Sequence, residues 1–531
     1  MKLKRPQLVH HSSVVKLFQA AEQALQRKDF QQNFELLERA RSLDPANPAI
    51  LLQLGRSHGL RYNYTAAEEC FEKAIQLAQN KTQIMAMAGA QSCDFFNPEL
   101  AERYFRRAVE QKDATVGMLV QLAEIYEMFF HRMAEASQMI DRALQMDPTF
   151  QRALLTRARL ERQAGHLEEA EKLLRSILAT TDQETRIRAY YQLGAALDRQ
   201  GRYDEAMAAF IEAKAPFQAQ SGAFFLQRQI AGAHLREILT SISAETFQRW
   251  FDFGRELQPP RRLAMLCGHP RSGTTLLEQV LDSHPDIISA EETTVFYESV
   301  YLPLARTQPP PAPRPGLPPQ FQMSDQVELS VLEAAPKDLL QQLRENYFQT
   351  MERCLGKPID NRLLVDKNPA LTLLLLGFQR VFPEVKLIVA LRDPRDVVLS
   401  CFMQNFAVLA PRHTAFFNLK DTVEQYVEEM NIWRTLAPMI PGRYLEVRYE
   451  DMVEDLESVA RRTLDYLGVS WDVKVVHFYE RARQRRVRTP GYADVGRPVF
   501  KTARGRWRNY QKYLEPYLYR LEPFVKAFGY E

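Results

Sequence analysis

Eight residues near the middle of the chain, 268–275, have the pattern of a loop that binds phosphate or sulfate. Their letters, GHPRSGTT, keep the glycines and the closing hydroxyl residue of a G-x-x-x-x-G-x-[ST] loop. Such a loop offers backbone N–H groups and a helix N-terminus to an oxyanion. An NTPase carries lysine where this loop has Thr274, and the only cation of the loop is Arg271. The loop therefore suits a terminal anion but lacks the usual means of cleaving a triphosphate.

The residues around the loop predict the elements that hold it. The apolar run 263–267 predicts a buried strand before the loop, and residues 275–281 predict the start of an amphipathic helix after it. A strand, a glycine-bounded turn and a helix in this order belong to an α/β fold with a central parallel sheet. We therefore expect the loop at the carboxyl edge of that sheet, where open α/β sheets bind ligands.

A second candidate anion site follows another apolar run, residues 385–391, which predicts a central strand of the parallel sheet. Arg392 comes directly after this strand. Asp393 and Pro394 are a good N-cap and a good first helical residue, so Arg392 is expected at the same sheet edge as the loop. The alternative for Arg392 is a salt bridge within its own turn, with Asp393 or Asp396.

Two acids and a lysine end further predicted strands. Glu291 and Glu292 follow residues 286–290, and Lys367 follows residues 363–365. A carboxylate can accept the proton of an attacking hydroxyl, and a cation can stabilise a departing anion. Successive side chains of an extended segment alternate, so we expect Glu291 to point away from Glu292.

The motifs, taken in order, resemble the PAPS-dependent sulfotransferases, and most closely their tyrosylprotein sulfotransferase branch. The resemblance covers about the second half of the chain and rests on PRSGTTL at 270–276, LDSHP at 281–285 and EET at 291–293. It implies 3′-phosphoadenosine 5′-phosphosulfate (PAPS) as donor substrate, PAP as product and no required metal. Two anion sites on one sheet suit a nucleotide with phosphates on both sides of its ribose.

The resemblance implies a role for each residue that matches a motif. Glu292 matches the general base, and Lys367 and Arg271 match the cations that hold the departing phosphate. Arg392 and Ser400, eight positions apart, match the pair that binds the 3′-phosphate. The further nucleotide contacts that it implies are Ser272, Gly273, Thr274, Thr275, Tyr449, Arg497 and Lys501.

Four positions carry alternatives or depart from the family pattern. Cytosolic small-molecule sulfotransferases use a histidine as base, but we expect structural roles for His269, inside the loop, and His284, in a turn before Pro285. Arg395 is expected to be a solvated residue at a helix start. The animal tyrosylprotein enzymes have arginine after their EET motif, where it helps to recognise acidic residues. This chain has Thr294 there, so the resemblance does not imply a preference for acidic sequences.

The first half of the chain repeats small residues with a period of about 34, which is the pattern of tetratricopeptide (TPR) repeats. Small side chains let the two helices of each repeat pack closely, and each pair buries its apolar face against its neighbours. We predict about six repeats that form a superhelix with a concave groove for a protein or peptide. The three series are Ala40, Ala74, Ala108, Ala143, Ser176 and Ala213; Gly55, Gly89, Ala123, Ala158 and Gly194; and Ala67, Ala101, Ala136, Ala170 and Ala206.

These patterns predict three parts: TPR repeats at 1–218, a connecting helical segment at 219–258 and a sulfotransferase-like domain at 259–531. The fold class is therefore α followed by α/β. A proline-rich run at 309–315 is expected to be a surface loop. Because every motif lies beyond residue 258, a fragment that starts near Pro259 is expected to keep nucleotide binding.

Composition sets limits on the cellular setting. A net charge of +3 and 25% charged residues do not indicate a nucleic-acid or membrane partner. Five cysteines without C-x-x-C spacing predict thiols of a reducing compartment rather than disulfides or a zinc site. No apolar stretch of membrane-spanning length is present, and no signal-peptide core follows the first residues. We therefore expect a bacterial, cytoplasmic protein.

Three functions are compatible with these features. The first is a PAPS-dependent sulfotransferase whose repeats present a protein or peptide acceptor, with a glycan, a lipid or a small phenol as alternative acceptors. The second is an NTPase or nucleotide kinase, which Thr274 disfavours. The third is a TPR scaffold with a degenerate nucleotide-binding domain, which the intact Arg271, Glu292, Lys367 and Arg392 disfavour.

Overall fold

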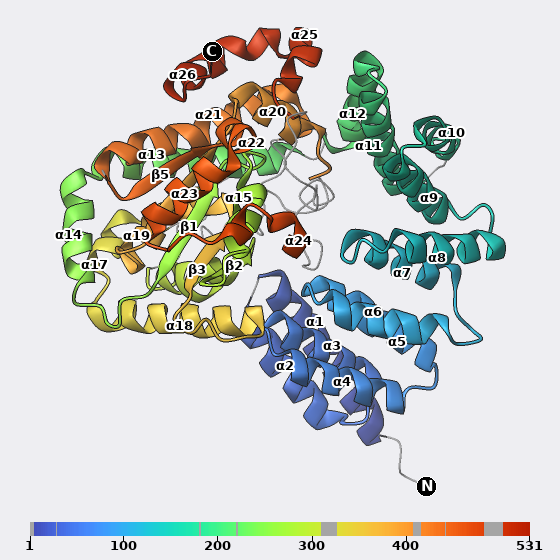
Figure 1. The fold of residues 1–531 in the computed structure, drawn as a ribbon. Coiled ribbons are helices and arrows are strands. Elements are labelled where there is room, and N and C mark those ends of the chain that lie inside the picture. The colour runs from blue at the N-terminus through green and yellow to red at the C-terminus, as the bar shows by residue number, and fades with distance from the viewer. Residues whose placement is uncertain are drawn as a thin grey trace. The chain divides into compact units, whose positions relative to one another are not determined.

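The computed structural model divides the 531-residue chain into two compact units, Met1–Ile177 and Leu178–Glu531 (Figure 1). It confirms the predicted fold class, with helical TPR repeats followed by an α/β domain built on a five-stranded parallel sheet. The residues that the structure describes are 5–27, 29–179, 182–218, 221–308, 327–406, 416–440, 442–482 and 503–530.

The first unit consists of five helical hairpins, each made of two helices that pack against each other. Asparagine or aspartate side chains cap several of these helices, because their oxygens accept hydrogen bonds from the first free backbone N–H groups. The helices are α1 (Arg5–Gln26), α2 (Phe30–Leu43), α3 (Pro48–Leu60), α4 (Tyr64–Leu77), α5 (Lys81–Asp94), α6 (Pro98–Val109), α7 (Val116–Met128), α8 (Met133–Met146), α9 (Gln151–Ala164) and α10 (Leu167–Ile177).

The small residues of the repeats lie where paired helices touch. A Cβ added to Gly89 of α5 would lie 2.7 Å from the Phe105 ring of α6, which leaves no room for a larger residue. All members of the second and third series are inaccessible or in close contact, as predicted. The prediction is wrong for one member of the first series, because Ser176 is exposed and its neighbour Ile177 is buried instead. Helix α10 thus packs Ile177, one residue later than predicted, into the core.

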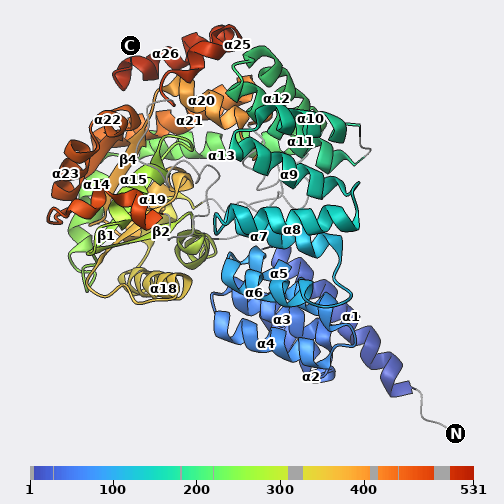
Figure 2. The same ribbon diagram turned by 45° about the vertical axis from the view of Figure 1, so that its right-hand side comes forward.

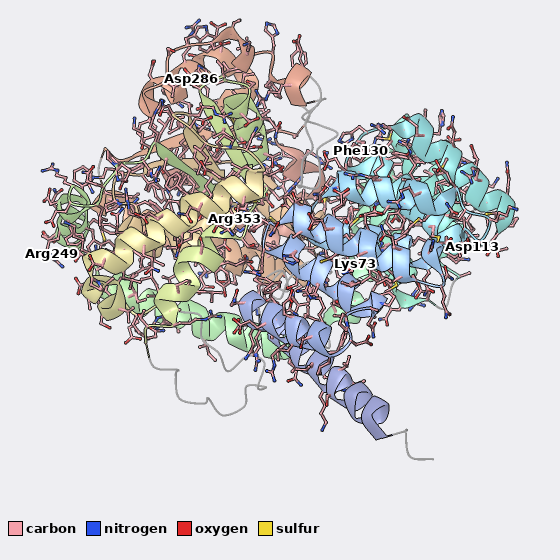
Figure 3. All side chains as sticks on the ribbon, turned by 90° about the horizontal axis from the view of Figure 1, so that it is seen from below. Lys73, Asp113, Phe130, Arg249, Asp286 and Arg353 are labelled. Atoms are coloured by element: carbon pink, nitrogen blue, oxygen red, sulfur yellow. The ribbon has the colours of Figure 1, made fainter. Side chains whose placement is uncertain are left out.

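Polar contacts supplement this packing. Arg107 of α6 reaches back to Glu72 of α4 and so joins neighbouring hairpins. Thr82 at the start of α5 donates a hydrogen bond of 2.6 Å to Asp113, which Figure 3 labels. Each hairpin is therefore held by contacts to the hairpin next to it, as in other repeat proteins.

The second unit is built around five parallel strands in the order β2-β3-β1-β4-β5, with helices on both faces (Figures 1 and 2). Strand β1 lies at the centre, so the chain leaves it in one direction for β2 and β3 and later returns to its other side for β4. The carboxyl end of β1 is the kind of position where such sheets bind ligands. The strands are β1 (Leu263–Gly268), β2 (Ile287–Glu291), β3 (Leu363–Lys367), β4 (Lys386–Leu391) and β5 (Tyr444–Arg448).

One face of the sheet shares a single apolar core with helices α15, α22 and α23, in which Leu266, Ile388 and Val447 are fully buried. On the other face, α18 and α21 bond to strand side chains through Tyr347 and Trp433. Arg249, labelled in Figure 3, pairs with Glu333 at 2.7 Å and joins α14 to α17. The helices are α13 (Ser221–Ser241), α14 (Ala244–Gly254), α15 (Thr274–Asp282), α16 (Leu302–Ala305), α17 (Leu329–Ala334), α18 (Lys337–Leu355), α19 (Leu375–Val381), α20 (Pro394–Met403), α21 (Leu419–Leu436), α22 (Tyr449–Glu454), α23 (Leu456–Leu467), α24 (Phe478–Ala482), α25 (Gln511–Leu514) and α26 (Leu518–Ala527).

A sixth hairpin, α11 (Gln183–Arg199) and α12 (Tyr203–Gln218), has the packing of a repeat but belongs to the second unit. A Cβ added to Gly194 would lie 2.7 Å from Phe210, as in the preceding hairpins. Compactness therefore divides the chain before this hairpin, whereas the repeat pattern ends after it. The domain boundaries predicted from the sequence at residues 218 and 258 stay predictions.

Lys214 of α12 ties this hairpin to the α/β domain. Its ammonium is fully buried, donates a hydrogen bond of 2.6 Å to the Phe416 carbonyl and lies 4.8 Å from the centre of the Phe402 ring. No carboxylate among the described residues forms an ion pair with it. Burial consequently lowers the pKa of Lys214 to about 7.

All five cysteines are free thiols, in line with the expectation that none forms a disulfide. Cys267, Cys354 and Cys401 are buried, while Cys70 and Cys93 are partly exposed. Within the described residues, none of the helices combines the length and the apolar character that crossing a bilayer requires.

Lys214 makes the stability of the second unit depend on pH. The unfolded chain binds a proton at this lysine up to about pH 10.4 but the folded unit only up to about pH 7, so raising the pH stabilises the folded state. We expect the free energy of unfolding of wild type, relative to Lys214→Met, to rise by about 2 kcal/mol between pH 7 and pH 9. All four tryptophans lie in the second unit, so fluorescence during urea unfolding reports on this unit.

Lys512→Met is the matched control, because the Lys512 ammonium is exposed and pairs with Asp204 at 2.8 Å. Its stability difference from wild type is expected to stay level over the same pH range. A level difference for Lys214→Met as well would show that Lys214 keeps an ordinary pKa in the folded protein.

Candidate active site

The loop after β1 adopts backbone conformations that its sequence pattern requires. Gly268 has φ +132°, and a Cβ there would collide with the backbone of Ala390 on β4. Gly273, with φ +94°, is the N-cap of α15. Arg271 also has a positive φ, +71°, which is uncommon for a residue with a side chain and is concentrated at functional sites. The loop thus leads into the first turn of α15, whose N–H groups lack partners within the helix.

The structure brings the two predicted anion sites together. The Arg271 Nε group donates a hydrogen bond of 3.1 Å to Ser400 Oγ on α20, and Arg392 Nη1 donates one of 3.2 Å to the Arg271 carbonyl. Tyr449 lies under the Arg392 guanidinium, 4.8 Å from ring centre to Cζ, and packs on Gly273. These five residues, from the β1 loop, the β4 end, α20 and the start of α22, therefore form one cluster.

Arg392 forms one of the two alternative ion pairs in its own turn, with Asp396 at 3.9 Å, a distance too long for a hydrogen bond. Asp393 pairs with Arg395 at 2.7 Å instead. The Arg392 side chain is 9% exposed, and its Nε is buried without a hydrogen-bond acceptor among the described residues. A buried guanidinium N–H without a partner is costly, so this group fits a further anionic oxygen such as that of a phosphate.

A second cluster lies on the neighbouring strands. Lys367 ends β3 and is fully buried, and its Nζ lies 2.9 Å from Glu292 Oε1 and 3.4 Å from Glu291 Oε1. Burial alone would lower the pKa of Lys367, but the carboxylates of Glu292, Glu291 and Glu278 outweigh burial and raise it. Lys367 therefore carries its positive charge at neutral pH, next to a carboxylate that is one-third exposed.

The expectation that Glu291 points away from Glu292 is wrong. Strand β2 ends at Glu291, and Glu292 has φ +47°, so the alternation of an extended chain stops at this residue. The Glu292 N–H donates a hydrogen bond of 2.7 Å to the Lys367 carbonyl, which keeps both acids beside the same lysine. They differ in exposure, since the Glu291 side chain is 5% exposed and that of Glu292 33%.

Both histidines have structural partners, as expected. His269 is buried beside Tyr426, and its Nδ1 lies 3.0 Å from the Pro270 carbonyl. His284 Nε2 lies 2.8 Å from the Ser470 carbonyl, while its Nδ1 accepts a hydrogen bond from the Asp286 N–H. Among the described residues, neither ring forms a hydrogen bond or an ion pair with Lys367, Glu291 or Glu292.

Other predicted residues fall into three groups. Ser272 and Thr274 are buried in the loop and Thr275 is partly exposed. Arg395 is not solvated as expected, because its guanidinium lies 4.2 Å from the centre of the Trp507 ring and its side chain is 13% exposed. Arg497, Lys501 and the proline-rich run 309–315 lie outside the residues that the structure describes.

Asp396 has a role in the site that the sequence did not predict, beyond its ion pair with Arg392. Its carboxylate accepts hydrogen bonds from the backbone N–H groups of Gly505 (2.7 Å) and Trp507 (2.8 Å). It thereby fixes the C-terminal segment beside Arg392, whose Nη2 donates a hydrogen bond of 2.6 Å to the Ala503 carbonyl. Burial raises the pKa of Asp396. Only its position in the turn after β4 distinguished this acid in the sequence.

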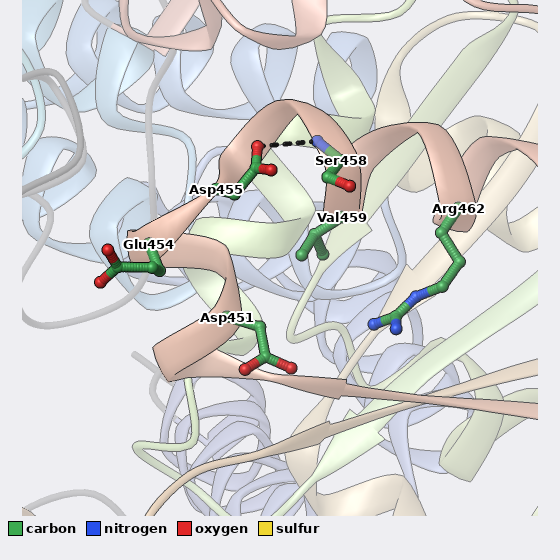
Figure 4. A pocket seen from close by; sticks show the side chains of 6 residues that line it. All are labelled: Asp451, Glu454, Asp455, Ser458, Val459 and Arg462. Atoms are coloured by element: carbon green, nitrogen blue, oxygen red, sulfur yellow. Dashed lines mark hydrogen bonds between the residues drawn. The ribbon is translucent and has the colours of Figure 1, made fainter.

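A surface pocket on the same unit has the opposite character. It lies over α22 and α23 and gathers acidic side chains (Figure 4). Asp455 is engaged as the N-cap of α23, since it accepts a hydrogen bond of 3.1 Å from the Ser458 N–H. Such a lining disfavours anionic ligands, in contrast to the Arg271–Arg392 cluster. The lining residues are Asp451, Glu454, Asp455, Ser458, Val459 and Arg462.

Comparison with known proteins decides between the classes that this geometry allows. A model of the sulfotransferase family matches residues 264–473, from β1 to beyond α23. Residues 264–473 of this chain form a sulfotransferase-family domain. Two models of tetratricopeptide repeats match the first half, at residues 49–81 and 187–214 and at residues 130–190.

Relatives of the chain match it at low identity, and some of them are sulfotransferases by name. A protein of Aquifex aeolicus (strain VF5) that carries the name "Uncharacterized protein" is 25% identical over 434 residues, which cover 79% of this chain and 52% of the relative. A putative protein-tyrosine sulfotransferase of Caenorhabditis briggsae is 24% identical over 41% of this chain and 70% of its own. Protein-tyrosine sulfotransferase 1 of Danio rerio is 26% identical over 41% and 56%. The chain thus spans between about half and 70% of the length of these relatives.

The charges of the Lys367 cluster allow a prediction about the stability of the second unit. Lys367→Met removes a fully buried cation from between two carboxylates, so we expect the free energy of unfolding of the second unit to fall by about 3 kcal/mol. Adding Glu291→Gln removes one of the buried charges and is expected to recover part of that loss. Urea unfolding followed by tryptophan fluorescence measures both.

Lys386→Met is the matched control on the same sheet. The Lys386 ammonium donates to the Tyr466 carbonyl at 2.8 Å and does not face a carboxylate pair. We expect its loss to be the smaller of the two. If the two lysines cost the same, the carboxylates beside Lys367 are not charged in the folded protein.

Proposed function

We propose that the protein transfers the sulfuryl group of PAPS to a hydroxyl acceptor. The observation that carries this proposal is the cluster of Arg271, Arg392 and Ser400 at the sheet edge, with the Lys367–Glu292 pair on the strands beside it. Membership of the sulfotransferase family supports PAPS as the donor. The buried Arg392 Nε without an acceptor supports a phosphate at this position.

Each residue of the two clusters has a distinct task in this proposal. Arg392 and Ser400 bind the 3′-phosphate, and the loop at Arg271 binds the 5′-phosphate. PAPS supplies the sulfuryl group. Glu292 accepts the proton of the acceptor hydroxyl while its oxygen forms a bond to sulfur. The bond between sulfur and the bridging phosphate oxygen breaks, and Lys367 stabilises the charge that PAP carries away.

We propose a protein or peptide as the acceptor, with a tyrosine hydroxyl as the first candidate. Two observations support it: the protein-tyrosine sulfotransferases among the relatives and the TPR repeats, which are protein-binding modules in many chains. This chain has Thr294 where the animal enzymes have arginine, so we do not propose that it requires acidic residues around the target. A glycan, a lipid or a small phenol is the alternative acceptor, and a cytoplasmic location stays a prediction.

The acceptor can be found by its label. The protein is incubated with PAPS that carries labelled sulfur and with a lysate of the cells in which it occurs, and the label is then located in protein, glycan, lipid or small-molecule fractions. Label on tyrosine after protein hydrolysis supports the proposed acceptor. Label in another fraction identifies one of the alternatives, and the absence of transfer contradicts the proposed activity.

Nucleotide selectivity tests the anion cluster directly. We expect PAP to bind without Mg²⁺ and ATP to bind much more weakly, because Thr274 replaces the lysine of an NTPase loop. Arg392→Ala is expected to weaken PAP by about 1.5–3 kcal/mol, the scale of charge-assisted hydrogen bonds. Titration calorimetry measures these affinities, with Arg461→Ala on the exposed face of α23 as the control.

The outcome that contradicts this assignment is Mg²⁺-dependent binding of ATP together with no binding of PAP. Unchanged PAP affinity in a folded Arg392→Ala variant would instead limit Arg392 to holding the C-terminal segment.

Substitutions of the two neighbouring acids, Glu291 and Glu292, test which of them is the base. Glu292→Gln is expected to lower the rate of label transfer by about 10²–10⁴, the usual loss for a positioned base, and to leave PAP affinity unchanged. Glu291→Gln is the matched control: its side chain is buried beside Lys367, so we expect a smaller loss of rate. If the two variants exchange their effects, Glu291 is the base.

A further inference from the structure

The sixth repeat hairpin contacts the C-terminal segment of the sulfotransferase domain through one carboxylate. Asp198, near the end of α11, accepts a hydrogen bond from Arg506 Nη2 at 2.5 Å and another from the Tyr510 hydroxyl at 2.7 Å. The Tyr203 ring at the start of α12 meets the Tyr510 ring edge-on, with centres 5.3 Å apart. The Asp198 side chain is 15% exposed, whereas that of its partner Arg506 is 40% exposed.

The opposite side of the same segment holds the nucleotide cluster. The Ala503 carbonyl accepts from Arg392 Nη2, and Gly505 and Trp507 donate their N–H groups to Asp396. Between Ala503 and Tyr510 the segment is thus bonded to the first turn of α20 on one side and to α11 on the other. Figures 1 and 2 both show α25, which follows directly, beside α12.

Lys214 gives the sixth hairpin a second contact, this time with helix α20. It lies over the ring of Phe402, two residues beyond Ser400 on α20. The hairpin therefore contacts both parts of the chain that surround Arg392: the helix that carries Ser400 and the segment that accepts the Arg392 hydrogen bond.

We propose that Asp198 is a positioning residue that holds the C-terminal segment against Arg392, so that the last repeat hairpin is a working part of the nucleotide site. The proposal rests on the proposed function, because it concerns the affinity of that site for PAP. Without Asp198, Arg506 and Tyr510 lose their shared acceptor. The turn at Ala503 then keeps its bonds to Asp396 and the Arg504–Glu454 ion pair but loses its support from α11, so the carbonyl that accepts from Arg392 is held less firmly.

The proposal changes the expectation for a shortened chain. A fragment that starts near Pro259 lacks both Asp198 and Lys214, and we expect it to bind PAP weakly or to fail to fold. This differs from the expectation based on sequence motifs alone, since all motifs lie beyond residue 258 but two of their supports do not.

The test uses the full chain and PAP as the probe. In titration calorimetry, Asp198→Ala and Arg506→Gln are each expected to raise the Kd of PAP about tenfold, or about 1.4 kcal/mol. Because both remove the same support, the double variant is expected to bind about as well as either single variant. Hydrogen exchange of residues 503–510 in the PAP complex is expected to become faster in each variant, while the urea midpoint from tryptophan fluorescence changes little.

Asp204→Ala is the matched control on the same hairpin. Asp204 also accepts from a lysine and a tyrosine of the C-terminal region, Lys512 at 2.8 Å and Tyr513 at 3.0 Å, but it is exposed and lies beyond the segment at Arg392. Its PAP affinity is expected to equal that of wild type. Asp198→Asn, which keeps an acceptor but loses the charge, is expected to lie between wild type and Asp198→Ala.

The outcomes separate this inference from the proposed function. If wild type does not bind PAP, the proposed function itself is contradicted. If wild type binds PAP and neither Asp198→Ala nor Arg506→Gln changes its Kd, the positioning role is overturned. An equal loss in Asp204→Ala would also overturn it, because the effect would then belong to the hairpin as a whole. Should Asp198→Ala fail to fold, Asp198→Asn and Arg506→Gln decide between these outcomes.

Discussion

The guanidinium of Arg392 is the point at which the distant parts of the second unit meet. It donates to a carbonyl 121 residues earlier in the chain and to another 111 residues later, and its flat face lies on Tyr449. A single planar group with several fixed donors can join segments in this way, which a lysine could not do. The position of the β1 loop, the start of α22 and the C-terminal segment all depend on it.

Two buried lysines of this unit show how surroundings decide charge. Lys367 lies among carboxylates, so its positive charge is retained despite burial. Lys214 faces a carbonyl and aromatic rings, so burial dominates and its pKa falls. The first arrangement suits a group that must meet developing negative charge. The second suits a structural contact between a helix of the repeats and the α/β domain.

Local rules were enough to predict the elements that carry the site. An apolar run before a glycine-bounded loop gave β1 and α15, and an aspartate followed by proline gave the start of α20. Local rules failed at two places. The positive φ of Glu292 ends the alternation of side chains that an extended strand would have. In α10 the buried position shifts by one residue, from Ser176 to Ile177. The bond between Asp198 and Arg506 spans 308 residues and follows no local pattern, so the sequence alone did not predict it.

The sixth hairpin has an evolutionary consequence. Repeats in an array can be gained or lost by duplication and recombination, because each contacts mainly its neighbours. In this chain the last hairpin, α11 and α12, cannot be lost in the same way. Gly194 and Phe210 keep the repeat packing, but Asp198 and Lys214 bond to the α/β domain. Homologous chains should therefore vary in the number of hairpins upstream of residue 177 and inherit the last one together with the domain that follows it.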